Sequence, residues 1–295
     1  MNPHQLSKTA AYVAIKFYGL TLMKPYRDLF DKEVLLFYDR LIADLPAPLD
    51  SYHSLLKNGW FRSACMKIDK TLLPGDLMHI LMRKSYLPAS IERLIDKGYS
   101  QVIILGAGFD HIGRTFSQKG ITCVELDVDR MVQVKQRFLK QYGYTNKNLT
   151  VWPINISERS LYDTLGEIPA LNPDERTVAV AEGFFDYLTP EEFSKTLNGL
   201  SAFFVNKLKL VSTVFSLQEL TRFQTFVFRN SVKAVGERLK LNASLDDFES
   251  ILNENDFKVD KNLTAQEMRD GMALTGDLET SVLRGFYLLE ASKRM

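Results

Sequence analysis

The sequence predicts an α/β fold in which helices cover both faces of a doubly wound, seven-stranded, mostly parallel sheet. Strand and helix patterns alternate regularly from residue 99 onward, as they do in sheets of this kind. A short, largely β-branched run at 102–105 is typical of a strand that is buried on both faces. No convincing strand pattern precedes this run. We therefore expect a helical cap formed by residues 1–97 and a core domain formed by residues 98–295.

The helices of the predicted cap are defined by apolar residues at helical spacing and by start and stop signals. Ser7 or Thr9 can cap the first helix, because either hydroxyl can accept a hydrogen bond from an N–H group of the first turn. Pro88 can open a short helix that ends at Gly98. Further helices are expected over three ranges: 32–45, 52–68 and 75–84.

The core domain alternates between apolar strands and helices that begin at capping residues. The segment at about 217–256 is helical, and its stretch rich in Phe and Arg fits either a lid or an amphipathic core helix. The last two strands fit a hairpin-like ending with an antiparallel terminal strand. The predicted helix starts are Ser157, Thr189 with Pro190, Ser244 and Thr264. The predicted strands are 102–105, 121–127, 148–154, 177–185, 207–215, 256–262 and 281–291.

Two glycines and an acid follow the buried run at 102–105. Gly106 and Gly108 allow the backbone to turn sharply and to approach a ligand at the carboxyl end of the strand. A dinucleotide-binding turn would have a third glycine at the position of His111. Asp110 is a candidate cofactor-binding residue, because its charge would repel a diphosphate and attract a cation. A ligand with a ribose and an ammonium group but no phosphate fits this turn, and S-adenosylmethionine is such a ligand.

Composition and charge argue against several classes of protein. The 37 basic and 36 acidic residues leave the net charge near zero, so we expect no nucleic-acid partner. Cys65 and Cys123 lack a metal-binding spacing, which indicates free thiols, no metal site and a reducing, cytoplasmic compartment. Lysines interrupt and flank the apolar stretch 10–23, so it predicts neither a secretory signal nor a membrane span. Nothing in the sequence indicates an oligomeric state.

Three motifs show a resemblance to a known family. They are ILGAGFD at 104–110, VELD at 124–127 and AEGFFDYLTPEE at 181–192. In these motifs, and over most of its length, the chain resembles the leucine carboxyl methyltransferase family of S-adenosylmethionine-dependent enzymes. The resemblance implies a class I methyltransferase fold, which is Rossmann-like, and S-adenosyl-L-methionine as the cofactor. The expected antiparallel ending agrees, because it separates methyltransferases from most dehydrogenases.

The resemblance also implies roles for residues around the cofactor. Lys16 and Arg83 correspond to basic residues that lie near the cofactor carboxylate. Asn155 stands where family members usually have a carboxylate, and its amide oxygen can still accept a hydrogen bond, so we expect weaker binding. The remaining implied positions are Gly106 and Gly108 along the methionine part, Asp127 at the ribose, Asn155 and Ile156 at the adenine, and Glu182 near the sulfonium.

The expected reaction is O-methylation by in-line displacement, in which placement of the acceptor supplies much of the rate. The resemblance favours a carboxylate acceptor, on a small molecule or a protein C-terminus, which is ionised at neutral pH and needs no base. Tyr187 is then the candidate catalytic residue that orients the acceptor, and Lys16 or Arg83 neutralises it. A hydroxyl acceptor would need a base, and the chain's histidines are His4, His53, His79 and His111.

Two other functional classes stay open. A nicotinamide-dependent oxidoreductase would share the glycine turn and the strand-end acid, although His111 and the motif around Glu182 count against it. A non-catalytic relative could keep the fold and act as a binding protein, because a fold does not determine a function. Under the methyltransferase hypothesis the expected partner is the acceptor alone, with neither nucleic acid nor a membrane.

Overall fold

The computed structural model describes residues 6–234, 236–272 and 281–294. It contains a seven-stranded sheet with the strand order β3-β2-β1-β4-β5-β7-β6. Neighbouring strands are parallel, except that β7 is antiparallel to both β5 and β6. This confirms the predicted fold class, including the antiparallel terminal strand. The strands are β1 (Gln101–Leu105), β2 (Thr122–Asp127), β3 (Leu149–Pro153), β4 (Thr177–Ala181), β5 (Leu208–Phe215), β6 (Phe257–Thr264) and β7 (Phe286–Lys293).

Helices surround this sheet, and those before β1 form a block of their own in the sequence. They are α1 (Lys8–Thr21), α2 (Lys24–Arg27), α3 (Lys32–Ala43), α4 (Ser51–Lys57), α5 (Gly59–Leu72) and α6 (Asp76–Asp96). The later helices are α7 (Ile112–Gln118), α8 (Asp129–Gln141), α9 (Leu161–Gly166), η1 (Phe185–Tyr187), α10 (Pro190–Phe203), η2 (Leu217–Glu219), α11 (Arg222–Ala234), α12 (Leu245–Glu254) and α13 (Ala265–Gly271). None of the described helices is long and apolar enough to cross a membrane.

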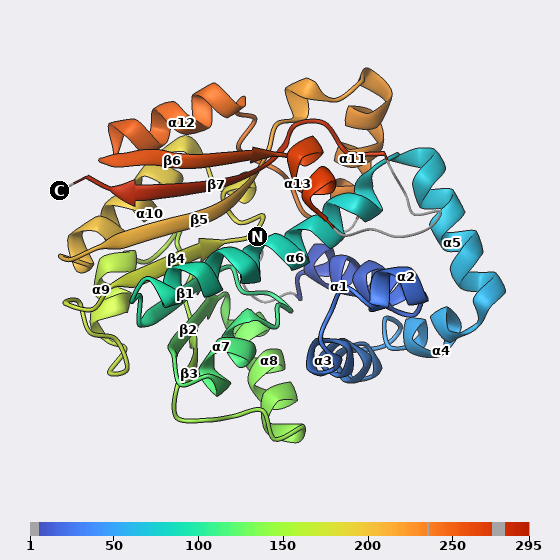
Figure 1. Cartoon of the computed structure of the whole chain (residues 1–295), viewed down its shortest axis with the longest axis horizontal. Coiled ribbons are helices and arrows are strands. Elements are labelled where there is room, and N and C mark those ends of the chain that lie inside the picture. Colours follow the sequence, from blue (N-terminus) through green and yellow to red (C-terminus); the bar gives the residue numbers. More distant parts are fainter. Residues whose placement is uncertain (1–5, 235, 273–280, 295) are drawn as a thin grey trace.

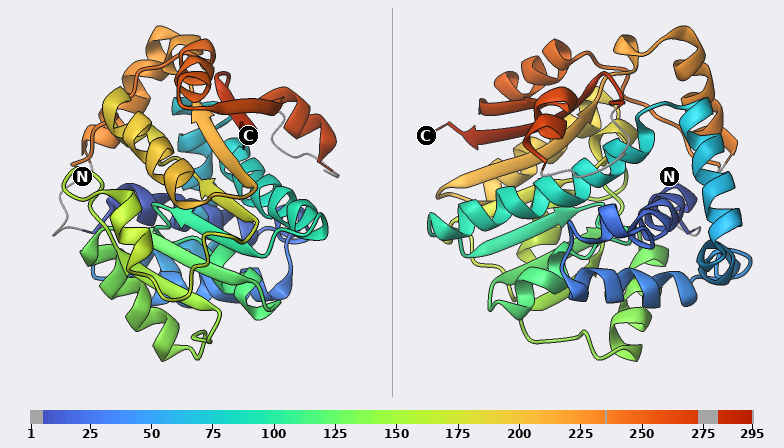
Figure 2. Two further views of the ribbon diagram at one scale, coloured as in Figure 1. Left: turned by 90° about the vertical axis from the view of Figure 1, so that its left-hand side faces the viewer. Right: turned by 45° about the vertical axis from the view of Figure 1, so that its right-hand side comes forward.

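The sheet is covered on both faces, and β1 shows how alternating side chains serve two cores. Val102 and Ile104 join a core with α1, α3, α6, α7 and α8. Ile103 and Leu105 join a second core with α9, α10 and α12 on the opposite face. The two views of Figure 2 show this arrangement of helices around the twisted sheet. Because helices before residue 97 share a core with the sheet, the division between a cap and a core domain stays a prediction.

The parallel strands all end on the side of the sheet where α1, part of α6 and α11 lie. In Figure 1 the arrow of β4 points towards this side, and that of β7 points away from it. Ligands of open α/β sheets bind outside the carboxyl ends of the strands, where the strand order reverses. In this sheet the reversal lies between β1 and β4, so the site is expected at their carboxyl ends.

Capping residues were the most accurate local predictions. The Ser7 hydroxyl accepts a hydrogen bond from the N–H of Ala10 at the start of α1. Thr189, Ser244 and Thr264 each form a capping box at the start of α10, α12 and α13. In a capping box, two side chains three positions apart satisfy two N–H groups that would otherwise lack a partner. The motif can therefore be recognised from a few neighbouring residues of the sequence.

One prediction about the cap was wrong at Pro88. The structure has a single helix, α6, through Asp76–Asp96 with Pro88 inside it, where we expected one helix over 75–84 and a second that starts at the proline. Leu87, Ile91 and Leu94 on this helix are buried in the core. The free energy gained by burying these side chains offsets the loss of the backbone hydrogen bond that a proline removes from a helix.

Other predicted element bounds were also wrong. The expected helix over 52–68 is two helices, because the Asn58 side chain accepts hydrogen bonds from the N–H groups of Trp60 and Phe61 and starts α5. Ser160, not Ser157, caps the helix after β3. The described part of the segment predicted to be helical over about 217–256 contains three separate helices, η2, α11 and α12.

Candidate active site

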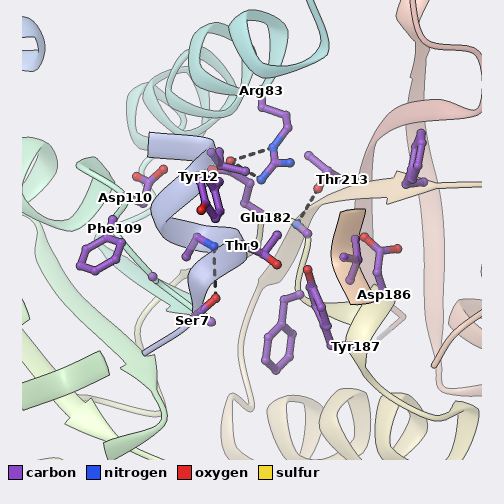
Figure 3. A pocket seen from close by; sticks show the side chains of 18 of the residues that line it. Ser7, Thr9, Tyr12, Arg83, Phe109, Asp110, Glu182, Asp186, Tyr187 and Thr213 are labelled. Atoms are coloured by element: carbon purple, nitrogen blue, oxygen red, sulfur yellow. Dashed lines mark hydrogen bonds and ion pairs between the residues drawn. The ribbon is translucent and has the colours of Figure 1, made fainter. Parts of the chain in front are cut away.

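A cavity of about 490 Å³ lies at the carboxyl ends of the parallel strands. This volume is typical of sites for cofactors and small molecules. Figure 3 shows part of its wall, with Phe109 and Asp110 on one side, Asp186 and Tyr187 on the other, and Glu182 between them. The cavity wall includes all ten predicted site residues: Lys16, Arg83, Gly106, Gly108, Asp110, Asp127, Asn155, Ile156, Glu182 and Tyr187.

The glycine turn after β1 requires two residues without side chains. Gly106 and Gly108 have φ angles of +61° and +47°, in the left-handed region that favours glycine. A Cβ atom on Gly106 would lie 2.5 Å from the ring of Phe184. The backbone of Gly108 donates a hydrogen bond to Asp127 Oδ2 at 2.7 Å. The turn is therefore held against the end of β2 and lies open to the cavity.

Asp127 ends β2 and is fixed by the main chain. Its Oδ1 accepts a hydrogen bond from the N–H of Val128 at 2.7 Å, and its Oδ2 accepts the one from Gly108. Burial raises the pKa of this carboxyl, and the two backbone N–H groups oppose that shift. Each carboxylate oxygen retains a further lone pair, which can accept a hydrogen bond from a diol. This geometry fits the ribose of S-adenosylmethionine.

Asn155 and Ile156 follow β3 and extend the same side of the cavity. Asn155 Oδ1 accepts a weak hydrogen bond from the N–H of Ser157 at 3.3 Å, which holds the side chain near its own backbone. With the turn and Asp127, these residues form the β2 side of the pocket: Gly106, Gly108, Asp127, Asn155 and Ile156. A glycine cradle, a strand-end carboxylate and an amide fit an adenosine ligand without phosphate.

Glu182 follows β4 and lies in a buried network of charges. The Nε and Nη2 atoms of Arg83 approach its Oε1 at 2.8 and 2.7 Å. Lys84 contacts Glu182 Oε2 at 3.0 Å and Asp110 Oδ2 at 2.5 Å. Burial opposes the charged form of Lys84, but the two carboxylates outweigh it and raise the pKa of its ammonium. Sequence reasoning did not single out Lys84, although it is adjacent to Arg83 in the chain.

Asp110 has structural contacts that its predicted role did not include. Besides the ion pair with Lys84, its Oδ1 accepts a hydrogen bond from the N–H of Ile112 at the start of α7. Burial opposes the ionised form, and the Lys84 ammonium holds the pKa of Asp110 well below its usual range. The carboxylate thus fixes the helix start while it also lines the cavity. Its contact with the cofactor stays a prediction.

Lys16 lies on α1 between two carboxylates of the helical segment. Its Nζ contacts Asp76 Oδ2 at 2.6 Å and also pairs with Asp69. Burial alone would lower the pKa of Lys16, but both carboxylates act against it and the pKa is raised. This pairing leaves the predicted contact of Lys16 with a cofactor carboxylate untested, and it gives the lysine a clear role within the protein.

The opposite side of the pocket, which we name the β5 side, comprises Asp186, Tyr187, Thr213, Phe215, Phe228 and Phe286, together with His79. The ring centroids of Phe215 and Phe228 lie 4.6 Å apart. The ring of His79 stacks on that of Phe215, with 5.7 Å between their centroids. Thr213 Oγ1 accepts a hydrogen bond from the N–H of Gly183 at 2.8 Å, so β5 supports the turn after β4 (Figure 3). This side combines an apolar wall with a few polar groups. Burial raises the pKa of Tyr187.

Of the histidines considered as bases, His79 is the one described histidine in the cavity wall. Burial lowers its pKa, which weakens it as a base. His53 pairs with Asp39 outside the cavity, and buried His111 at the start of α7 has its pKa lowered to about 4. His4 lies outside the described residues. No group of acidic, histidine and cysteine residues in the described chain could hold a metal ion.

The strand order with an antiparallel β7 and the glycine turn after β1 are those expected of the class I methyltransferase fold. A proposed methyltransferase from Thermobifida fusca YX has a similar fold, with a TM-score of 0.60 and 15% identity over 87% of this chain and 94% of that one. A DUF574 family protein from Streptomyces avermitilis has a TM-score of 0.58 and 9% identity over 79% of this chain and 90% of that one. Among curated proteins, none matches.

The family model for leucine carboxyl methyltransferases matches residues 31–201, which is more than half of the chain. The chain therefore belongs to the leucine carboxyl methyltransferase family. It is an S-adenosylmethionine-dependent methyltransferase, as the sequence motifs predicted. The match covers the strands from β1 to β4 and most of the helix α10, and it leaves out α1 with Lys16 and everything from β5 onward.

Proposed function

We propose that this methyltransferase transfers the methyl group to a hydroxyl oxygen of an acceptor with an apolar body. The observation that carries the proposal is the charge of the cavity wall. It contains four cationic side chains and six acidic ones: Lys16, Arg83, Lys84 and Lys240, and Asp69, Asp76, Asp110, Asp127, Glu182 and Asp186. The cofactor brings an ammonium, a sulfonium and a carboxylate, so its single net positive charge does not reverse this excess of acid.

Each of the four cations already has a carboxylate partner. Lys16 pairs with two aspartates, Arg83 and Lys84 share Glu182, and Lys240 pairs with Glu192 at 2.9 Å. The residues outside the described ranges include neither lysine nor arginine. A carboxylate acceptor would therefore bring a negative charge into a pocket in which every described cationic side chain is already paired, and a buried unpaired charge is costly.

The apolar body of the acceptor follows from the β5 side of the pocket. Phe215, Phe228 and Phe286 come from β5, α11 and β7, and they form one wall with Val227 and Leu239. Aromatic side chains of this kind contribute large contact areas to a bound ring or chain. An acceptor with a ring or an alkyl chain next to its hydroxyl fits this wall.

The residues of the two sides then have distinct tasks. When bound, S-adenosylmethionine supplies an electrophilic methyl group on a positively charged sulfur. Asp127 holds the ribose, the turn at Gly106 and Gly108 admits the backbone close to the ligand, and Glu182 contributes negative charge near the sulfonium. Tyr187 orients the acceptor. Placement of this kind accounts for several orders of magnitude in rate.

A carboxylate acceptor, on a small molecule or a protein C-terminus, is the second candidate. It follows from the family membership, and one detail of the site favours it. Glu182 occupies the Nε and Nη2 edge of the Arg83 guanidinium, so Nη1 is the donor that a carboxylate could use. That acceptor stays a prediction, as does the expectation that neither nucleic acid nor a membrane takes part.

The two candidates differ in the stability of their product. We would offer the enzyme tritiated S-adenosylmethionine with acceptors matched in their apolar part, such as 4-phenylphenol and 4-phenylbenzoate. A methyl ether survives mild alkali, whereas a methyl ester releases labelled methanol. Alkali-stable product from phenols supports the proposal, and alkali-labile product from acids alone would replace it with the carboxylate reaction. Calorimetric titration with S-adenosylhomocysteine and with NADH checks the cofactor site independently.

A further inference from the structure

One carboxyl group of the pocket has no assigned role. Asp186 lies in the turn η1, four residues after Glu182 and directly before Tyr187. It lines the cavity on the β5 side, where Figure 3 places it beside Tyr187 and across the pocket from Asp110. This side also carries the apolar wall, so Asp186 lies where the proposed acceptor would bind.

The contacts of Asp186 differ from those of the other acids in the cavity wall. Its carboxylate faces the backbone N–H of Phe215, and no lysine, arginine or histidine of the described residues lies within ion-pair distance. The other five acids are already engaged: Asp69 and Asp76 by Lys16, Asp110 and Glu182 by Lys84, and Asp127 by two backbone N–H groups. Asp186 therefore retains capacity to accept a hydrogen bond from a ligand.

The backbone holds Asp186 in a fixed position. Its carbonyl oxygen accepts hydrogen bonds from the N–H groups of Lys240 and Leu241 at 2.9 and 3.2 Å. These bonds tie η1 to the chain that follows α11, the helix that contributes Phe228 to the apolar wall. A carboxylate that must meet an acceptor atom needs this kind of support, because small displacements of a catalytic group lower the rate strongly.

Burial of Asp186 brings the titration of its carboxyl close to neutral pH. Burial raises its pKa to about 7, while the positive charge of Arg83 and the N–H of Phe215 oppose that shift. Arg83 is already paired with Glu182, and the Lys240 ammonium points to Glu192. Tyr187 and His79, the other titratable groups on this side, are neutral because burial raises the pKa of the phenol and lowers that of the imidazole.

We propose that Asp186 accepts the proton of the acceptor hydroxyl during methyl transfer. The inference rests on the proposed hydroxyl acceptor and names the base that this acceptor needs. The acceptor oxygen forms a bond to the methyl carbon as the carbon–sulfur bond breaks, and that electron pair stays on sulfur. The hydroxyl proton passes to the Asp186 carboxylate. The products are the methyl ether, a neutral thioether and a protonated Asp186, so atoms and charges balance.

The first test measures binding and needs no turnover. In the presence of S-adenosylhomocysteine, 4-phenylphenol is titrated into the wild-type protein between pH 6 and pH 8. Because the phenol donates to the ionised carboxylate, its affinity rises about tenfold over this range, as expected for a group that ionises near pH 7. An affinity that stays flat or falls, or no binding at all, would overturn the proposal without any variant.

The second test compares Asp186→Asn with Asp163→Asn, the same change at an exposed position on α9 outside the cavity. In Asp186→Asn the pH dependence of phenol binding disappears, kcat/KM for ether formation falls by about 100-fold or more, and affinity for S-adenosylhomocysteine is unchanged. Asp163→Asn retains the wild-type values.

The outcomes separate this inference from the proposed function. Ether formation that survives Asp186→Asn with the wild-type pH profile refutes the role of Asp186 and leaves the hydroxyl acceptor standing. Ester formation by both proteins refutes the hydroxyl acceptor itself. Loss of S-adenosylhomocysteine binding in Asp186→Asn would show that Asp186 maintains the pocket, and that result also counts against the proposal.

Discussion

The β2 side and the β5 side of the pocket are built in different ways. Asp127 is the last residue of β2, and the other residues of the β2 side lie within three positions after the end of β1 or β3. The β5 side gathers residues from α6, η1, β5, α11 and β7, which are separated by more than 200 positions between His79 and Phe286. One side depends on local turns, and the other depends on how distant elements pack.

This difference corresponds only in part to what the family model matches. The family match ends at residue 201, so it includes the whole β2 side. Of the β5 side it includes His79, Asp186 and Tyr187 and excludes Thr213, Phe215, Phe228 and Phe286. We therefore expect cofactor binding to depend on the matched part, and the identity of the acceptor to depend also on the unmatched aromatic wall. Variants on the two sides should therefore affect different measurements.

The largest effect is expected at the turn of the β2 side. Gly106→Ala forces a side chain into the left-handed region and places its Cβ 2.5 Å from Phe184. Left-handed strain costs about 1 to 2 kcal/mol and overpacking about 1 to 3 kcal/mol, so the free energy of unfolding should fall by about 2 to 5 kcal/mol. Urea unfolding measures this loss.

Gly120→Ala is the matched control for that variant. Gly120 also has a positive φ angle, of +87°, but its Cβ would meet no atom within 4 Å. The free energy of unfolding of Gly120→Ala should fall only by the cost of the left-handed backbone strain, about 1 to 2 kcal/mol. Equal losses in the two variants would contradict the close contact between the turn and Phe184.

The next effect concerns the cofactor. Asp127→Ala removes the carboxylate that the N–H groups of Gly108 and Val128 hold at the end of β2. Binding of S-adenosylhomocysteine should weaken by about 1 to 3 kcal/mol, the range for a hydrogen bond to a charged group. Ser231→Ala, in α11 on the far wall, should leave that affinity unchanged in the same calorimetric titration. If the dissociation constant of S-adenosylhomocysteine were unchanged in Asp127→Ala, Asp127 would not be the residue that binds the ribose.

On the β2 side the glycine turn and the strand-end acid could be predicted from the strand pattern, and the family resemblance added Asn155 and Ile156. Once the strand order is known, Gly106, Asp127, Asn155 and Glu182 must lie together at one edge of the sheet. The same reasoning predicted the sheet and most helix caps. It failed at Pro88, where burial of one helical face overrides a local signal.

The β5 side could not be predicted for a physical reason. Whether Phe228 lines a cavity or fills a core depends on how α11 packs, and no pattern within α11 distinguishes the two. Lys16 and Arg83 were found by resemblance, but Asp69 and Asp76, the partners of Lys16, were not. Lys84 beside Arg83 was not found either. Asp186 stood within a quoted motif, and only its lack of a cationic partner in the fold makes it stand out.

A third prediction tests whether Lys16 serves the fold or the cofactor. Lys16→Met leaves Asp69 and Asp76 facing each other without their cation. Because Lys16 is about one-third exposed, we expect a loss of about 1 to 2 kcal/mol at pH 7, between the values for surface and buried pairs. Urea unfolding of wild type and variant at pH 7 and pH 3 measures it.

The pH dependence of that loss has a definite sign. Burial opposes the ionised form of Asp76, but its interactions with Lys16 and His79 together outweigh burial and lower the folded pKa. The ion pair therefore stabilises the fold above the unfolded pKa near 4 and ceases to do so as pH falls. The gap between the two proteins should therefore shrink at pH 3. Lys67→Met, an exposed change on α5, should show neither effect. Weaker S-adenosylhomocysteine binding at unchanged stability would instead support the predicted cofactor contact.

The smallest expected effect concerns Asp186 on the β5 side. A raised carboxyl pKa means that the folded state binds its proton more tightly than the unfolded chain does, so wild type loses stability as pH rises from about 4 through about 7. Asp186→Asn has no proton to lose there. Its melting temperature relative to wild type should therefore be higher at pH 8 than at pH 5, by a few degrees if the effect is about 1 kcal/mol. Asp163→Asn should follow wild type at both values. If the difference in melting temperature between Asp186→Asn and wild type were the same at pH 5 and pH 8, the Asp186 carboxyl would titrate as it does in water. It would then be too weak a base at neutral pH for a hydroxyl acceptor.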